Sequence, residues 1–337
     1  VKINDGQNMI DPFAFMALND DPELQQKVSI TYTEDKYPNS YLLPDINYYS
    51  KHNKIRIGYF SADFREHPVS TLTVGLFELH DRSQFEIYAF SYGYDTQDEM
   101  NLRIKAGVDH FYDVQTMSHK EIVLLSRSNE IDIAVDLGGL TAGARTNIFA
   151  MIVAPIQLSY IGFLGTIGAN YYDYLVADKI LIPEKNQKYF SEKIVYLPCF
   201  QVNDSKESIP DKNFARKDLG LPEKGFVFCC FNNTFKITPT TFDSWCRILE
   251  KVKDSLLLIY VNNNTAQINL IKEITPPEIN LMMIIIVAME VIITIIITII
   301  IIITIIITII IGDGITIIMI IHMIVHVDKI IKLVIIA

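Results

Sequence analysis

Apolar runs recur along the first two thirds of the chain, and each ends in small or polar residues. Runs of this length, bounded by turn-forming residues, are typical of buried strands. They cover residues 54–61, 85–92, 131–137, 156–163, 172–178 and 193–198. Between them the pattern predicts helices over 71–80 and 119–129, and a helix followed by a turn over 99–111. Because strands that alternate with helices form parallel sheets, we predict an α/β fold.

A charged, proline-bearing segment over residues 204–225 interrupts this alternation and is typical of a linker between domains. The next segments are predicted as a strand, an amphipathic helix and a strand, over 226–233, 238–252 and 255–264. This order is the opening of a second α/β domain. At the start of the chain, Asp11 before Pro12 favours a helix, so residues 1–50 are expected to form a helical linker.

The pattern changes abruptly after the pair Pro276 and Pro277. From Val291 to Ile311, 16 of 21 residues are Ile, four are Thr and one is Val. About 20 uncharged apolar residues suffice to span a bilayer, which makes a membrane anchor one interpretation. Natural spans carry aromatic or basic residues at their ends, whereas no Trp, Tyr or Phe follows Pro276 here.

Two other interpretations of this tail remain open. Met, Val and Thr codons each lie one base from an Ile codon, so AT-rich DNA read out of frame would give such a sequence. A tract of stiff β-branched residues also favours β-aggregation in water, and an unusual core is the remaining alternative. We expect residues 276–337 to be a low-complexity artefact or a decayed gene end.

Composition narrows the class of protein. The chain has 337 residues, of which 50% are hydrophobic, so it has enough apolar surface to bury and disorder throughout is excluded. A net charge of −10 argues against a nucleic-acid binder. Four cysteines without metal spacing argue against a disulfide framework or a zinc site and predict a reducing, cytoplasmic compartment. The first residue is Val1 and no apolar signal sequence follows, so a fragment or a processed product is expected.

Three clusters of candidate chemistry follow predicted strands of the first domain. His67 lies in the cluster 63–68, where it could act as a base or merely sit exposed in a capping loop. The glycine-rich clusters 136–145 and 162–169 could bring backbone close to a ligand or could form simple turns. Arg145 could clamp an anion or anchor the next helix. Neither cluster has the glycine spacing of a dinucleotide or P-loop motif.

A fourth cluster, over residues 231–239, lies at the start of the second domain. Lys236 stands beside a predicted helix N-terminus, which is a favourable place for a phosphate oxygen. The alternative is an ordinary solvated lysine. No paired metal ligands are found before the tail, and the pair His322 and His326 lies within the tail.

The four clusters, in the order in which they occur along the chain, resemble the catalytic region of the protein O-GlcNAc transferases, including their SPINDLY-like and bacterial members. The matching stretches are IRIGYFSADFREHPVS, DLGGLTAGARTNIFA, APIQLSYIGFLGTIGANYYDYLVAD, YFSEKIVYLPCFQVND and FVFCCFNNTFKITPTTFDSWCRIL. The resemblance covers about residues 10 to 272. Residues 10–50 resemble the linker that follows the family's tetratricopeptide repeats, which this chain does not contain.

The resemblance implies a GT-B architecture of two Rossmann-like domains with the nucleotide sugar held mainly by the second. We expect a linker over 1–50, the first domain over 51–205, the start of the second over 206–275, and then the tail. The family transfers N-acetylglucosamine from UDP-GlcNAc to Ser or Thr hydroxyls of proteins, with inversion and without a metal. Some plant-type relatives transfer fucose from GDP-fucose instead.

Residue roles follow from the same resemblance. His67 matches an active-site histidine, a proposed base or sugar-phosphate contact, and Lys236 matches the lysine that stabilises departing UDP. The matches expected to bind substrate are Thr141, Arg145, Gly165, Thr166 and Asn233. The expected partners are a UDP-sugar and a protein or peptide acceptor, with no nucleic acid, no membrane and no cofactor.

This chain also departs from the family pattern. A second histidine is replaced by Arg127, Ser128 and Asn129, and Cys199 stands where a His is common. The family's later donor motifs would follow about residue 275 and have no match. We therefore expect weak or no activity from this exact chain. A catalytically dead remnant that binds partners, and a membrane-anchored protein, are the alternatives.

Overall fold

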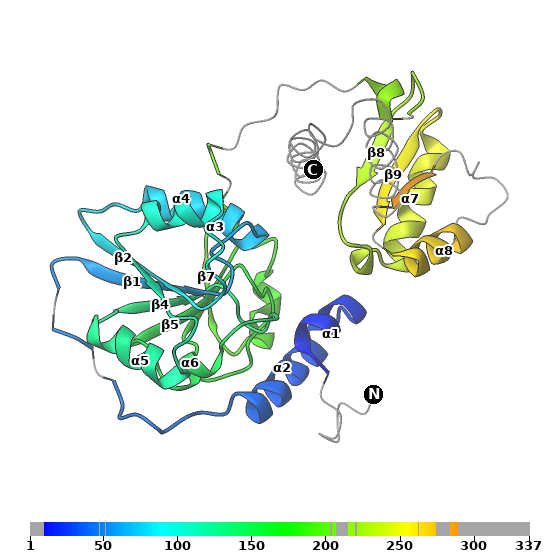
Figure 1. Cartoon of the computed structure of the whole chain (residues 1–337). Coiled ribbons are helices and arrows are strands. Elements are labelled where there is room, and N and C mark those ends of the chain that lie inside the picture. The colour runs from blue at the N-terminus through cyan, green and yellow to red at the C-terminus, as the bar shows by residue number, and fades with distance from the viewer. Residues whose placement is uncertain are drawn as a thin grey trace, which may run out of the picture. The chain divides into compact units, whose positions relative to one another are not determined.

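The computed structural model describes residues 10–46, 48–50, 52–202, 204–206, 215–219, 221–261, 263–273 and 284–288. The chain divides into two compact units between Pro210 and Asp211. Unit 1 precedes this point and unit 2 follows it (Figure 1). Each unit has its own sheet and its own core, so each is described by itself.

Unit 1 is built on a seven-stranded sheet with the order β3-β2-β1-β4-β5-β6-β7, and every neighbouring pair is parallel. The strands are β1 (Ile55–Ser61), β2 (Phe85–Ser91), β3 (His110–Asp113), β4 (Ile133–Asp136), β5 (Ile156–Tyr160), β6 (Tyr174–Ala177) and β7 (Lys193–Tyr196). This confirms the predicted parallel α/β fold. Strands β1 to β3 extend the sheet in one direction, and strands β4 to β7 extend it in the other. The order of strands therefore reverses between β1 and β4.

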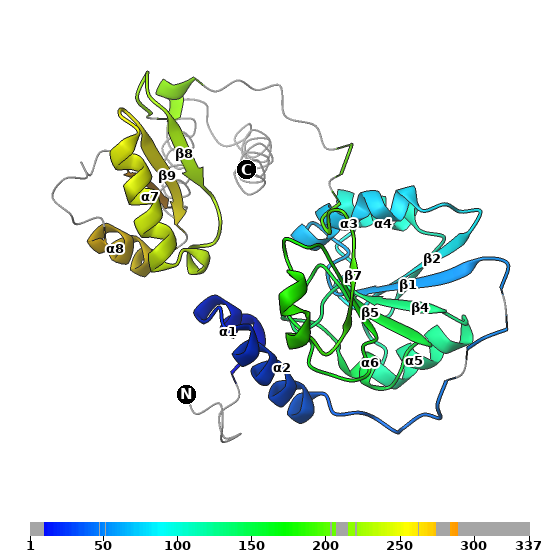
Figure 2. The same cartoon turned by 180° about the vertical axis from the view of Figure 1, so that it is seen from behind.

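Helices cover both faces of this sheet (Figure 1, and from behind Figure 2). One face carries α3 (Pro68–Leu79) and α4 (Glu99–Gly107), and the other carries α5 (His119–Ser128) and α6 (Asn147–Ala150). Successive strand residues point to opposite faces. Accordingly, Ile57 and Tyr59 of β1 pack in the core beneath α3, whereas Phe60 packs in the core beneath α5 and α6. Burial on both faces explains why the strands read as continuous apolar runs.

Two N-terminal helices belong to unit 1, namely α1 (Pro12–Leu18) and α2 (Pro22–Lys36). The Asp11 carboxylate accepts from the Ala14 N–H at 3.0 Å, which confirms the helix start predicted there. Asp21 caps α2 in the same way. A proline follows each capping Asp, at a position where its missing N–H costs nothing.

Three elements of unit 1 differ from the sequence prediction. Helix α3 begins at Pro68 rather than at residue 71, because His67 caps it and Pro68 suits the first turn. The turn predicted at the end of 99–111 is in fact strand β3, whose four residues are too few to show a periodicity. The short α6 was not predicted either.

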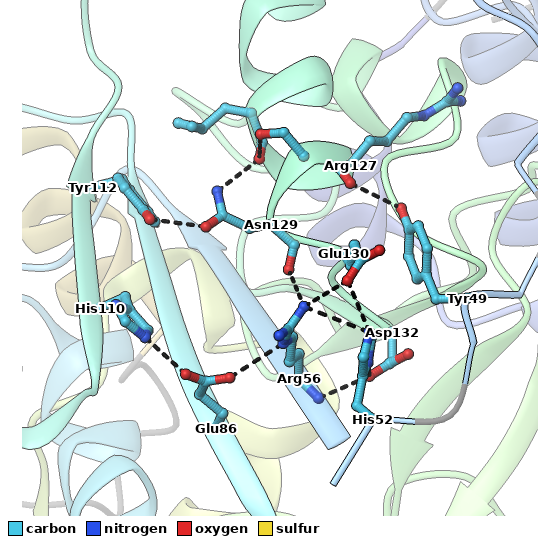
Figure 3. Close-up of polar contacts among 12 residues, drawn as sticks. Tyr49, His52, Arg56, Glu86, His110, Tyr112, Arg127, Asn129, Glu130 and Asp132 are labelled. Atoms are coloured by element: carbon cyan, nitrogen blue, oxygen red, sulfur yellow. Dashed lines mark hydrogen bonds and ion pairs between the residues drawn. The ribbon is translucent and has the colours of Figure 1, made fainter. Parts of the chain in front are cut away.

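A polar network joins the segment before β1 to the starts of the strands (Figure 3). Arg56 lies between Glu86, at 3.2 Å, and Glu130, at 3.0 Å. His52 contacts Glu130 at 3.0 Å and Asp132 at 3.1 Å, and its hydrogen bonds to these carboxylates raise its pKa. The network stands at the edge where the strands begin, so we interpret it as structural.

Unit 2 has a parallel three-stranded sheet with the order β10-β9-β8. Its strands are β8 (Val227–Cys230), β9 (Leu256–Val261) and β10 (Ile284–Ala288), and its helices are α7 (Pro239–Lys251) and α8 (Asn264–Glu273). Phe242 and Leu249 of α7 pack against Ile259 of β9. The predicted strand-helix-strand order is confirmed, whereas α8 had not been predicted. Strand β10 lies inside the segment expected to be an artefact, and the Ile-rich tract from Val291 lies outside the described residues.

Candidate functional site

The candidate residues of unit 1 lie at the edge of the sheet where the parallel strands end. The loop that carries His67 follows β1, the glycine-rich loop 136–145 follows β4, and the loop 162–168 follows β5. Since the strand order reverses between β1 and β4, the loops that follow these two strands flank the crevice where ligands bind in open α/β sheets.

Glycines allow these loops to pack directly on one another. A Cβ on Gly139 would lie 2.6 Å from the Cβ of Phe163, and a Cβ on Gly162 would lie 1.9 Å from the Leu137 carbonyl oxygen. A Cβ on Gly143 would stand 3.7 Å from the Cβ of Ala62, which follows β1. The structure thus brings together three clusters that are far apart in the sequence.

His67 is half-buried and its ring is held by its own helix. The Val69 N–H donates to His67 Nδ1 at 3.3 Å, so the imidazole caps α3. The Asp63 carboxylate lies 3.6 Å from the same nitrogen, and Asp63 also pairs with Arg65 at 3.1 Å. With Nδ1 accepting a hydrogen bond, a neutral imidazole carries its proton on Nε2.

Burial lowers the pKa of His67, while the nearby Asp63 carboxylate raises it and Arg65 lowers it further. The net direction is downward, which favours the neutral ring at neutral pH. A neutral ring with its proton on Nε2 donates to a ligand oxygen. A ring with its proton on Nδ1, facing Asp63, leaves Nε2 free to accept a proton.

Thr141 and Arg145 shape the glycine-rich loop. The Thr141 hydroxyl donates to the Gly138 carbonyl at 2.8 Å. The Arg145 guanidinium donates to the Met117 carbonyl at 2.7 Å, and burial lowers its pKa. It also lies over the Tyr92 ring, 6.0 Å from the centroid. These contacts hold Arg145 to the segment before α5, and its expected role in binding substrate stays a prediction.

Asp136 lies at the start of the predicted cluster 136–145, but the sequence assigned it no role. Asp136 ends β4 and is 1% exposed. Its carboxylate accepts from the Gly138 N–H at 2.8 Å and from the Tyr172 hydroxyl. Burial raises the pKa of Asp136 despite these donors. The nearby Tyr92 hydroxyl is buried without a hydrogen-bond partner among the described residues. No local sequence signal marks this group, since its members come from three separate strands or their ends.

Gly165 and Thr166 belong to the loop 162–168, and both are buried. The Thr166 side chain is 3% exposed and its hydroxyl donates to Glu192 at 2.7 Å. The prediction that Thr166 binds substrate stays a prediction. Its hydroxyl also accepts from the Gly168 and Ser191 N–H groups, and these contacts fix the shape of the loop.

Asn233 and Lys236 lie in unit 2, at the edge where β8 ends. Both side chains are exposed, and Lys236 closes a short 3₁₀ turn, Thr234–Lys236, just before α7. Thr238 caps α7 by accepting from the Thr241 N–H at 3.2 Å. A hollow of about 690 Å³ lies at the opposite end of these strands, beside Gly225 and Leu256, and does not include Lys236.

Within the described part of the chain, no helix is both long enough and apolar enough to cross a bilayer. Within the same residues, no cluster of three or more His, Cys, Asp or Glu side chains could hold a metal ion.

The fold and this edge define a Rossmann-like α/β protein whose strand order reverses between β1 and β4, followed by the start of a second such unit. A family model, glycosyl transferase family 41, matches residues 27–214 and 204–291. The chain belongs to this family. The resemblance to the catalytic region of the O-GlcNAc transferases is thereby confirmed.

Curated relatives of this family are longer than the chain. The SEC protein of Arabidopsis thaliana, a probable UDP-N-acetylglucosamine–peptide N-acetylglucosaminyltransferase, is 42% identical over 210 residues, covering 60% of this chain and 22% of that protein. The Caenorhabditis elegans UDP-N-acetylglucosamine–peptide N-acetylglucosaminyltransferase is 33% identical over 209 residues, covering 60% and 18%. The chain therefore spans about a fifth of the length of these relatives.

A solved structure gives the same assignment. A mutant O-GlcNAc transferase of Thermobaculum terrenum superimposes with a TM-score of 0.68 at 25% identity. The match covers 80% of this chain and 51% of that one. The GT-B class of fold predicted from the sequence is thus confirmed.

Proposed function

We propose that this chain carries the catalytic residues of a protein O-GlcNAc transferase. In this proposal, N-acetylglucosamine passes from UDP-GlcNAc to a Ser or Thr hydroxyl of a protein or peptide, with inversion and without a metal. The family match that runs through both units carries the proposal. The meeting of the loops after β1, β4 and β5, at the edge where ligands bind in such sheets, supports it.

The proposed roles follow from the chemistry of the transfer. With its proton on Nε2, His67 donates a hydrogen bond to the sugar-phosphate. With its proton on Nδ1, facing Asp63, it takes up the proton of the Ser or Thr hydroxyl at Nε2. Lys236 neutralises the charge that develops on departing UDP, and Asn233 contacts the diphosphate. Thr141, Arg145, Gly165 and Thr166 shape the sugar-facing loops. Because the later donor motifs have no match, we expect slow transfer.

Transfer is tested with the full chain, UDP-GlcNAc carrying a labelled sugar, and a Ser/Thr peptide, with chelator present. We expect slow incorporation, which falls at least tenfold in His67→Ala and in Lys236→Ala. His110→Ala and Lys251→Ala serve as matched controls. His110 belongs to the network at the far edge of the sheet and Lys251 ends α7.

Transfer that survives both site substitutions contradicts the site assignment. Transfer that occurs without chelator and is lost when chelator is added contradicts the metal-free mechanism. A parallel assay with GDP-fucose identifies the donor, since transfer of fucose in place of N-acetylglucosamine contradicts the proposed donor. The cytoplasmic location and the absence of nucleic-acid or membrane partners stay predictions.

A further inference from the structure

Glu192 belongs to none of the four candidate clusters, although it is a buried acid that contacts the loop 162–168. It stands one residue before β7 and is 4% exposed. Its Oε2 accepts from the Thr166 hydroxyl at 2.7 Å, and its Oε1 accepts from the Ile167 N–H at 2.6 Å. Burial raises its pKa, and no basic side chain among the described residues pairs with it.

The Thr166 hydroxyl is fully used by its neighbours. It accepts from the Gly168 N–H and from the Ser191 N–H, each at 3.1 Å. A hydroxyl has two acceptor positions and one proton, so the proton is left for Glu192. Both oxygens of Glu192 are therefore required as acceptors, one for a hydroxyl and one for an amide N–H.

The opposite side of the same loop rests on α2, blue in Figure 1. The Thr33 hydroxyl donates to the Ile167 carbonyl at 2.6 Å, and both residues are buried. Gly168 has a φ of +76°, and a Cβ there would lie 2.5 Å from the Ile30 nitrogen. The loop backbone is thus fixed between a helix and a buried carboxylate.

We propose that Glu192 is a positioning residue for the sugar transfer. Through Thr166 and Ile167 it holds the 162–168 loop in the shape that the reaction needs, and it does not itself touch substrate. This inference rests on the proposed function. It also changes the role of Thr166, which acts on the loop through Glu192.

Glu192→Gln is a sharp substitution because the side chain keeps its size. An amide has only one acceptor oxygen, so its NH₂ must face either the Thr166 hydroxyl proton or the Ile167 N–H. Thr166→Val removes the hydroxyl at constant shape, and Thr166→Ser restores it. Glu184→Gln is the matched control, since Glu184 is an exposed acid paired with Lys179 at 2.7 Å.

Each variant of the full chain is assayed by steady-state transfer kinetics and by hydrogen exchange of the 162–170 and 189–193 segments. For Glu192→Gln and Thr166→Val we expect kcat to fall at least tenfold with KM within threefold, and the Ile167, Gly168 and Ser191 amides to exchange at least tenfold faster. Thr166→Ser should stay within threefold of wild type. The double variant should be no worse than Thr166→Val alone, because both substitutions remove the hydrogen bond between Thr166 and Glu192.

The two readouts separate the possible failures. Faster exchange with unchanged kcat overturns the positioning role, and so does unchanged exchange in both variants. If Glu192→Gln does not fold, Thr166→Val and its Ser rescue decide the question. A wild-type chain that transfers no sugar contradicts the proposed function, whereas hydrogen exchange still shows whether Glu192 holds the loop.

Discussion

The His67 ring has two neighbours that favour opposite protonation states. The Val69 N–H at 3.3 Å requires a lone pair on Nδ1, whereas the Asp63 carboxylate at 3.6 Å favours a proton there. Burial decides in favour of the neutral ring, because a charged group loses hydration when it is buried. The same side chain therefore caps a helix and stays available to a ligand through Nε2.

Removal of the Asp63 charge should lower the pKa of His67 further, because this carboxylate is the neighbour that raises it. We expect His67 to titrate below 6.5 in the wild type, and at a still lower pH in Asp63→Asn. The C2 proton shift of His67, followed by NMR against pH, measures both. Asp95→Asn is the control, since Asp95 pairs with Lys105 and not with His67. An upward shift in Asp63→Asn would refute the assignment.

At the scale of elements, the site depends on how closely the loops after β4 and β5 approach each other. Gly139 has a φ of +61°, where L side chains are strained, and its Cβ position is already filled by Phe163. The contact sets the spacing of two loops that both carry candidate residues. Substitution there should therefore affect stability and transfer together.

Gly139→Ala should lower the free energy of unfolding by about 1–3 kcal/mol, the usual cost of a strained backbone position. Urea denaturation measures the change. Gly107→Ala is the control, because Gly107 ends α4, where the nearest atom to a Cβ is 3.3 Å away on the Glu78 side chain. A Gly139→Ala chain as stable as the control would show that the two loops can separate without cost.

At the scale of the whole molecule, ion pairs fasten the segment after β7 back onto the first unit. Arg103 of α4 pairs with Glu78 of α3 and with Asp204. Its hydrogen bonds lower the pKa of Glu78 to about 2. The pKa values of Glu86, Glu130 and Asp204 are lowered as well, so these carboxylates remain charged in the folded unit 1 to low pH.

Acid should therefore weaken unit 1. Glu78 has a lower pKa folded than unfolded, so its contribution is complete above about pH 4.5 and is lost as pH falls toward 2. Arg103→Met should remove much of this contribution and lower the free energy of unfolding at pH 7 by roughly 1–3 kcal/mol. The free energy of unfolding should then fall less steeply as the pH drops from 4.5 toward 2. Urea denaturation followed by far-UV circular dichroism at a series of pH values measures the free energy of unfolding and its loss in acid. Lys179→Met, at an exposed pair, should change neither quantity.

Several features of the fold could be predicted because their signals are local. Strands buried on both faces read as apolar runs, and Asp11 before Pro12 marks a helix start. Strand β3 could not be predicted, since four half-buried or exposed residues show no period. The start of helix α3 at Pro68 could not be predicted because His67 is an uncommon cap. Glu192 lies in a stretch that matches the family, but nothing in that stretch points to its contact with Thr166.

The sequence by itself determined the parallel α/β class of the first unit, most of its strands, the strand-helix-strand opening of the second unit, and the family to which the chain belongs. Each of these follows from patterns within short segments or from motifs in order. Only the tertiary structure decided which loops meet and which donors are already used. The bond between Thr33 and the Ile167 carbonyl spans 134 residues, and that between Thr166 and Glu192 spans 26. Such contacts depend on the order of strands in the sheet, so no short stretch of sequence contains them.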